Sequence, residues 1–119
     1  MLRLLRAATL AALFVSPSLS YGAGAIAVDD EAGEATDSIG YGSATGYGSR
    51  EEAGVAAMQQ CRAEGNRNCR VVVRFDTCGA YAVSRGHFGV GWGSTAGEAR
   101  AMALDACGAN CRVAIAECE

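Results

Sequence analysis

Some residue types and motifs are absent or rare in this chain of 119 residues, and several of these absences exclude a class of function. The chain has no lysine, and His87 is its only histidine. No serine lies in the G-x-S-x-G pattern of a nucleophile elbow, and no two cysteines have the C-x-x-C spacing common in zinc sites. The loose G-x-G-x-x-A match at 91–96 stands in a chain too short for a doubly wound nucleotide-binding domain. We therefore predict no metal site, no cofactor and no enzymatic activity.

Long apolar segments are missing as well. The only apolar run, Ala7 to Val15, is shorter than the about 20 residues that cross a bilayer. Arg3 and Arg6 precede this run and a short stretch of small residues follows it, which is the order of regions in a secretory signal peptide. We predict that residues 1–20 are a signal peptide cleaved after Ser20, in preference to a retained membrane anchor, and that the mature chain does not insert into a membrane.

Cationic charge is in short supply in the predicted mature chain, residues 21–119. Eight arginines stand against thirteen acidic residues, which gives a formal net charge of −5. Nonspecific binding to nucleic acids depends on a surplus of cationic side chains. We therefore expect no nucleic-acid partner.

Cysteine is a residue type that the mature chain does have in quantity. All six cysteines lie there: Cys61, Cys69, Cys78, Cys107, Cys111 and Cys118. An even number of cysteines in a small exported domain predicts disulfides, here three. A domain of about 99 residues buries a modest core and gains stability from such cross-links. The expected location is the periplasm or the medium, where thiolates that could hold zinc tend to be oxidised.

Two halves of the mature chain resemble each other. The matching segments are Gly24–Val28 with Gly79–Val83, Ser49–Ala53 with Thr95–Ala99, Cys61 with Cys107, and Cys69–Val72 with Cys111–Ala114. We predict a single disulfide-bonded domain over 21–119 with an internal duplication, whose copies cover about 21–78 and 79–119.

Each copy carries the signals of one helix. A hydroxyl residue followed three positions later by a glutamate forms a capping box, and the two boxes are Ser49 with Glu52 and Thr95 with Glu98. Alanines recur at helical spacing after each box. We predict helices that run to about Cys61 and Cys107.

The remaining segments have the patterns of strands. In 40–47 and 87–93, small residues alternate with larger ones, so one face of each strand is bare enough to accept an alanine-lined helix. Arg85-Gly86 has the composition of a tight hairpin turn, and 70–75 and 112–116 contain β-branched residues. The predicted fold is α+β, with two copies of a strand-strand-helix-strand unit, about six strands and two helices, stapled by disulfides.

The order of elements also predicts which cysteines pair. Each helix ends at a cysteine and the next strand begins at another, which favours Cys61–Cys69 and Cys107–Cys111. This scheme leaves Cys78 to pair with Cys118, in a bond expected to join the two copies.

These features together resemble one protein family. The ordered motifs are Gly-Ala-Ile-Ala-Val, a Gly/Tyr-rich strand, Ser-Arg-Glu-Glu-Ala, Cys-Arg-Val-Val-Val, Cys-Gly-Ala-Tyr-Ala-Val and Gly-Val-Gly-Trp-Gly-Ser-Thr, with the cysteines among them. Over about residues 21–118 this pattern is similar to the domain-of-unknown-function family 4189, whose members are small exported bacterial proteins. The resemblance implies a bacterial protein of the periplasm or the medium, and it implies no reaction.

The aromatic residues are the candidates for a contact surface. If they gather on one sheet face, they form a flat patch for a protein or glycan of the envelope, because aromatic and arginine side chains are preferred interface anchors. The candidate residues are Tyr41, Tyr47, Tyr81, Arg85, Phe88 and Trp92, with Arg74 as a flanking cation. The alternative is that the rings fill the core of an alanine-rich chain that has few other large side chains.

The features above predict a non-enzymatic binding or inhibitor module of the bacterial envelope or medium. Two alternatives stay open. One is a structural protein of the cell envelope. The other is a small hydrolase in which His87 works with a carboxylate such as Asp76 or Glu98.

Overall fold

The computed structural model describes residues 22–30 and 39–119. The predicted signal peptide and its cleavage site lie outside the described residues. The elements, in chain order, are β1 (Ala23–Asp29), β2 (Gly40–Tyr47), α1 (Arg50–Ala63), β3 (Arg70–Phe75), β4 (Cys78–Ser84), β5 (His87–Gly93), α2 (Ala96–Cys107) and β6 (Arg112–Cys118).

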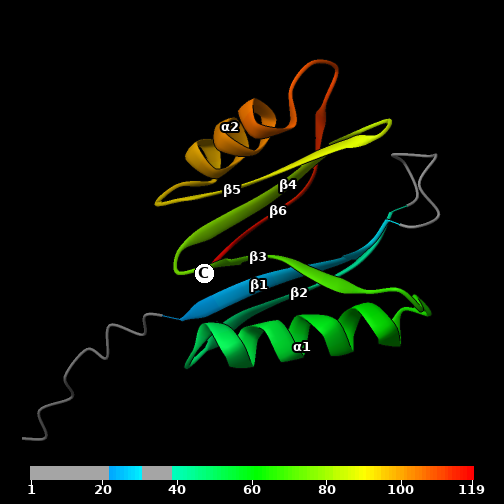
Figure 1. Ribbon diagram of the computed structural model, residues 1–119. Coiled ribbons are helices and arrows are strands. Elements are labelled where there is room, and N and C mark those ends of the chain that lie inside the picture. Colours follow the sequence, from blue (N-terminus) through cyan, green and yellow to red (C-terminus); the bar gives the residue numbers. More distant parts are fainter. Residues whose placement is uncertain (1–21, 31–38) are drawn as a thin grey trace, which may run out of the picture.

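The described elements form four layers in the order helix, sheet, sheet, helix (Figure 1). One sheet has the strand order β2-β1-β3 and the other β5-β4-β6, and all neighbouring strands are antiparallel. α1 covers the outer face of the first sheet and α2 covers the outer face of the second. Within the described ranges the order strand-strand-helix-strand occurs twice, so the predicted α+β fold with six strands and two helices is confirmed.

The central strand of each sheet supplies two cores because its side chains alternate between the two faces. In β1, Ala25 and Ala27 face α1, while Ile26 and Val28 face the other sheet. β4 repeats this pattern, and the core between the sheets consists of Ile26, Val28, Val73, Phe75, Tyr81, Val83 and Ile115. Each fully buried side chain of this size stabilises the fold by about 1.5–3 kcal/mol, so the layer between the sheets holds the two units together.

Glycines in β2 and β5 let the helices lie directly on the strand backbones. A Cβ atom added at Gly42 would come within 2.2 Å of the backbone nitrogen of Cys61. One added at Gly91 would come within 2.1 Å of the carbonyl oxygen of Ala99. No side chain fits in either place, so the bare strand faces predicted from the sequence are the faces that α1 and α2 occupy.

Both predicted helices begin where the capping residues place them. The Ser49 hydroxyl accepts a hydrogen bond from the backbone N–H of Glu52, and the Thr95 hydroxyl accepts one from Glu98, each at 3.1 Å. α1 continues two residues past its cysteine to Ala63, and α2 ends at its cysteine. Among the described residues, no helix is long and apolar enough to span a membrane.

All six cysteines are bonded, in the predicted pairs Cys61–Cys69, Cys107–Cys111 and Cys78–Cys118. The expected role of the third bond is wrong, however. The chain crosses from one sheet to the other at Asp76 and Thr77, so Cys78 is already the first residue of β4. It lies directly opposite Cys118 on β6, and the bond therefore links two strands of one sheet instead of the two sheets.

The duplication extends to irregularities of the strands. The pairing of β1 with β3 shifts between Ile26 and Ala27, and the pairing of β4 with β6 shifts between Tyr81 and Ala82. These are matching positions in the two motifs that the sequence repeats. The two sheets are therefore similar units down to the position of a β-bulge.

Candidate functional site

The predicted contact residues do not form one patch. Most of them lie on β2 and β5, and these strands lie at opposite edges of the stacked sheets, because β2 neighbours β6 while β5 neighbours β3. Tyr41 and Tyr47 therefore lie at one edge, and Phe88 and Trp92 lie at the other.

A β-bulge separates the two tyrosines of β2 as well. Tyr41 lies opposite Val28 and so faces the other sheet, as the alternation predicts. Gly46 then adopts a φ of 78°, and the pairing with β1 becomes irregular. Tyr47 ends up opposite Ala23, on the side of α1. The prediction that both rings share one face is therefore wrong.

Tyr81 belongs to the core and is therefore not part of a contact surface. It lies on the central strand of its sheet and is 0% exposed. Its hydroxyl donates a hydrogen bond to Oδ2 of Asp30 at 2.9 Å. Burial, together with this acidic partner, raises the pKa of Tyr81 well above its ordinary value, so the phenol is a neutral donor. For Tyr81 the core-filling alternative is the one that the structure shows.

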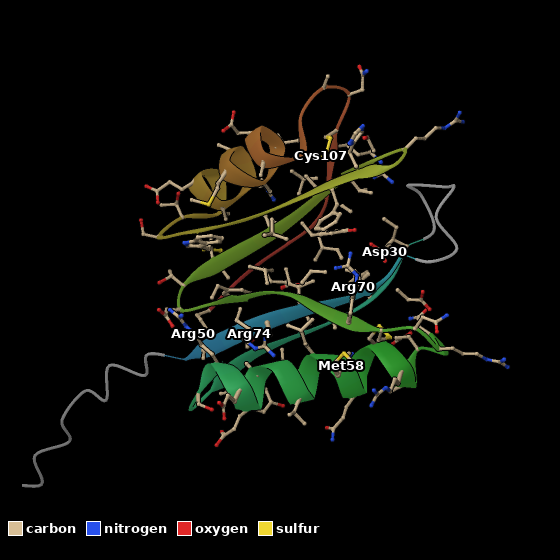
Figure 2. The ribbon with its side chains drawn as sticks, viewed as in Figure 1. Asp30, Arg50, Met58, Arg70, Arg74 and Cys107 are labelled. Carbon is tan, nitrogen blue, oxygen red and sulfur yellow. A yellow bond between two sulfur atoms is a disulfide. The ribbon has the colours of Figure 1, made fainter. Side chains whose placement is uncertain are left out.

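Phe88 takes part in a cluster that ties the two sheets together. Arg70 donates to Oδ2 of Asp30 at 2.7 Å, and this guanidinium lowers the pKa of the Asp30 carboxyl. The Arg70 Cζ atom lies 4.8 Å from the centre of the Phe88 ring, whose centre is 6.0 Å from that of Tyr81. Figure 2 shows Asp30 and Arg70 at this end of the sheets. Phe88 is 50% exposed, but its ring already has a partner in the fold.

Arg85 stands apart from the exposed rings. It lies in the turn between β4 and β5, as predicted, and it is exposed. Trp92 lies near the other end of β5. The structure therefore does not bring Arg85 to Trp92.

Trp92 adjoins an open hollow where the chain passes from β3 to β4. The indole is 54% exposed, and the hollow has a volume of about 470 Å³. Its charged side chains come from three places: Arg50 at the start of α1, Arg74 on β3, and Asp76 in the connection. Figure 2 shows the two arginines close together at this end of the fold. Sequence reasoning named Trp92 and Arg74 but missed Arg50, since nothing local marks an arginine at the start of a helix as part of a site.

Arg50 and Asp76 form a two-pronged ion pair. Nε of Arg50 lies 3.0 Å from Oδ1 of Asp76, and Nη2 lies 2.5 Å from Oδ2. The guanidinium lowers the pKa of the Asp76 carboxyl. Both side chains are well exposed, so water screens the pair and it adds little to stability. The two hydrogen bonds instead orient the planar guanidinium and the planar carboxylate relative to each other at the hollow that Trp92 also lines.

The Arg74 side chain packs against the backbone of α1 at Gly54. A Cβ atom at Gly54 would lie 2.9 Å from both Nε and Nη2 of Arg74, so the absence of a side chain leaves room for the guanidinium. Glycine inside a helix costs about 0.5–1 kcal/mol relative to alanine. Within residues 22–30 and 39–119, the Arg74 side chain makes no hydrogen bond or ion pair. The hollow thus contains one cation that no carboxylate of the described residues neutralises.

Ser94, at the rim of the hollow, makes hydrogen bonds within the fold. Ser94 donates its N–H and its hydroxyl to the Glu98 carboxylate, at 3.0 and 2.8 Å. These bonds lower the pKa of Glu98. In the second capping box the carboxylate therefore also binds the residue before the N-cap, while the backbone of Thr95 contributes to the same lowering of its pKa.

His87 does not meet the carboxylates that a hydrolase would require. It is the first residue of β5, whereas Asp76 and Glu98 lie near the end where that strand finishes. A strand of this length spans about 20 Å. In the part of the chain that the structure describes, no three histidine, cysteine or acidic side chains form a group that could hold a metal ion.

Fold and cysteines define a class of protein: a small disulfide-bonded domain of two stacked three-stranded sheets, each covered by one helix. Disulfides of this kind are typical of an oxidising extracytoplasmic compartment. The chain belongs to the family described as Domain of unknown function (DUF4189), whose model matches residues 23–118. A comparison with curated proteins and one with solved structures each gave no match.

Proposed function

We propose that this chain is a non-enzymatic binding module of the bacterial envelope or medium and that its ligand surface surrounds Trp92. The observation that carries the proposal is the position of the indole, which is 54% exposed at the rim of a hollow. Full burial of a large apolar side chain would have stabilised the fold by about 1.5–3 kcal/mol. Tryptophan is among the residues that contribute most to binding energy at interfaces, which favours a role in binding for this exposed ring.

The frame around Trp92 supports the same role. Trp92 pairs across the sheet with Gly79, and Gly93 pairs with Cys78, which is bonded to Cys118. The strand that carries the indole, β5, therefore pairs with β4, which a disulfide links to β6. A surface that is rigid before binding loses little conformational entropy when a ligand arrives, which favours affinity.

The two alternatives have less support. A hydrolase needs a base beside its nucleophile, and His87 lies at the end of β5 remote from Asp76 and Glu98. A structural envelope protein has no need of an exposed indole at a hollow. It predicts firm association with the cell wall and no saturable partner.

Affinity capture tests the proposal. The oxidised exported chain is immobilised and exposed to envelope and secreted fractions of the native cell. We expect one saturable component, which the variant Trp92→Ala no longer retains. The matched control is Val55→Ala on the outer face of α1, since Val55 is 59% exposed and lies outside the hollow. Equal capture by wild type and Trp92→Ala, with unchanged melting temperatures, contradicts the proposal.

A further inference from the structure

We propose that the hollow beside Trp92 binds a sugar that carries a carboxylate group, with the sugar ring against the indole and the carboxylate at Arg74. This inference rests on the proposed function and names the ligand class of the same surface. Figure 2 shows Arg50 and Arg74 at the end of the fold where β3 passes to β4.

The size of the hollow suits a small ligand. Its volume of about 470 Å³ lies within the range of about 300–1,000 Å³ that is usual for small-molecule sites. A protein partner usually covers about 800 Å² on each side of an interface. The exposed rings that such a partner would need are divided between two edges of the stacked sheets. The observations therefore favour a sugar over a protein.

The side chains around the hollow match the two kinds of surface on a sugar ring. The indole offers a flat face with partial negative charge, against which the C–H groups of a sugar ring can pack. The ion pair of Arg50 and Asp76 places N–H donors and carboxylate acceptors side by side in a fixed orientation. A sugar hydroxyl both donates and accepts, so neighbouring hydroxyls can bond to the two partners of one ion pair.

The charge of the hollow points to an acidic sugar. Asp76 compensates Arg50, whereas Arg74 has no carboxylate partner among the described residues. The planar fork of a guanidinium matches a carboxylate through two parallel hydrogen bonds. The mature chain carries an excess of acidic residues, so a surplus cation in this hollow is a local feature against the overall charge.

Comparison of the two units shows that the fold does not require these residues. The repeat aligns Arg50 with Ala96 at the start of the helix, Arg74 with Ala116 on the third strand, and Trp92 with Thr45. The second unit forms its helix without an arginine at its start. The first forms its second strand without the tryptophan. These residues therefore go beyond what the shared unit needs in order to form, which supports a role for them in ligand binding.

The intrinsic fluorescence of Trp92 tests the inference, because Trp92 is the only tryptophan of the chain. The oxidised protein is titrated with two matched pairs of probes, N-acetylmuramic acid against N-acetylglucosamine and glucuronic acid against glucose. Glucuronic acid has a carboxylate in place of the C6 hydroxymethyl group of glucose, and N-acetylmuramic acid carries a lactyl ether with a carboxylate on O3 of N-acetylglucosamine. We expect the acidic member of at least one pair to change the emission and to bind at least tenfold more tightly than its neutral partner.

Two arginine variants identify the contact. Arg74→Gln should remove the preference for the acidic sugar, while Arg62→Gln, near the other end of α1, should preserve it. The inference is overturned if no acidic sugar binds or if Arg74→Gln keeps the preference. Should neither acidic sugar bind while capture still finds a protein that depends on Trp92, the inference fails and the proposed function stands. If capture fails too, both fail.

Discussion

The guanidinium of Arg74 on β3 lies directly over Gly54 of α1, with both of its nearest nitrogen atoms 2.9 Å from the place where a Cβ atom of residue 54 would sit. The helix therefore gives up intrinsic stability at a position that faces the strand, and the arginine occupies the space. The glycine at position 54 therefore helps to place the positive charge of Arg74 in the hollow beside Trp92.

Gly54→Ala should separate stability from binding. The new methyl group meets the end of a flexible side chain, which can move, so the helix gains up to about 1 kcal/mol from the better helix former. Arg74 has to shift, and the affinity for an acidic sugar should fall severalfold. Thermal unfolding and fluorescence titration measure the two effects.

The control for this variant is Gly97→Ala in the first turn of α2, where the nearest atom to a new Cβ is the Thr95 hydroxyl oxygen at 3.9 Å. It should leave sugar binding unchanged. An equal loss of affinity in both variants would show that Arg74 does not mediate the effect.

Gly91→Ala should destabilise the domain. Its Cβ atom would lie 2.1 Å from the Ala99 carbonyl oxygen and 2.5 Å from the Ala103 nitrogen, and these backbone atoms cannot move without displacing α2. We expect a loss of about 1–3 kcal/mol or more, which lowers the melting temperature by at least about 4 °C. Gly48→Ala is the matched control, because its nearest contact is a Glu52 side-chain oxygen at 3.6 Å. A melting temperature of Gly91→Ala equal to that of the control would contradict the close helix–strand packing.

The three disulfides should differ in what they contribute. Their sequence separations are 40 for Cys78–Cys118, 8 for Cys61–Cys69 and 4 for Cys107–Cys111. The chain-entropy relation then gives losses of about 4, 2.5 and 2 kcal/mol when each pair is replaced by alanines. Urea unfolding of the three double variants measures this order. If the shortest loop gives the largest loss, native-state contacts and not loop closure set the contribution of these bonds.

Acid should weaken the cluster between the sheets. Hydrogen bonding to Arg70 lowers the pKa of Asp30 from the ordinary 3.8, so the carboxylate form is the one that the fold stabilises. This contribution is complete above the ordinary pKa and is lost as the pH falls through the lower pKa of the folded state. The stability difference between wild type and Asp30→Asn should therefore be largest near neutral pH and shrink below about pH 4.

Urea titrations at several pH values measure this difference, with Asp105→Asn, an exposed site on α2, as the control. A difference that stays constant from pH 7 to the acid limit would show that Asp30 contributes by its shape and hydrogen bonding and not by its charge.

The sequence was informative wherever the signal is local or periodic. Alternating glycines marked the faces on which the helices pack, and Ser49 and Thr95 marked where the helices start. The pairing Cys61–Cys69 followed from adjacent element ends. Each of these signals depends on residues only a few positions apart, or on a repeat of the same pattern.

The parts that were missed depend on contacts between distant segments. Arg50 and Asp76 are 26 residues apart, and no pattern links them before α1 packs against the first sheet. The burial of Tyr81 follows from its place on a central strand, which requires the strand order. The bulge at Gly46 is visible in the sequence when the two units are aligned. The first unit has one residue more between Gly42 and Ser49 than the second has between Gly89 and Thr95.

The bulge and the other differences between the two units have a consequence for how many ligands of this kind one chain can hold. A duplicated fold could in principle present the same surface twice and so cross-link two ligands. Here the bulge at Gly46 follows Thr45, which stands where the other unit has Trp92, and alanines stand in the places of Arg50 and Arg74. In the part of the chain that the structure describes, the residues of this hollow therefore occur once, so two similar units would offer one site for the proposed ligand. A single chain would coat such a ligand without bridging it to another.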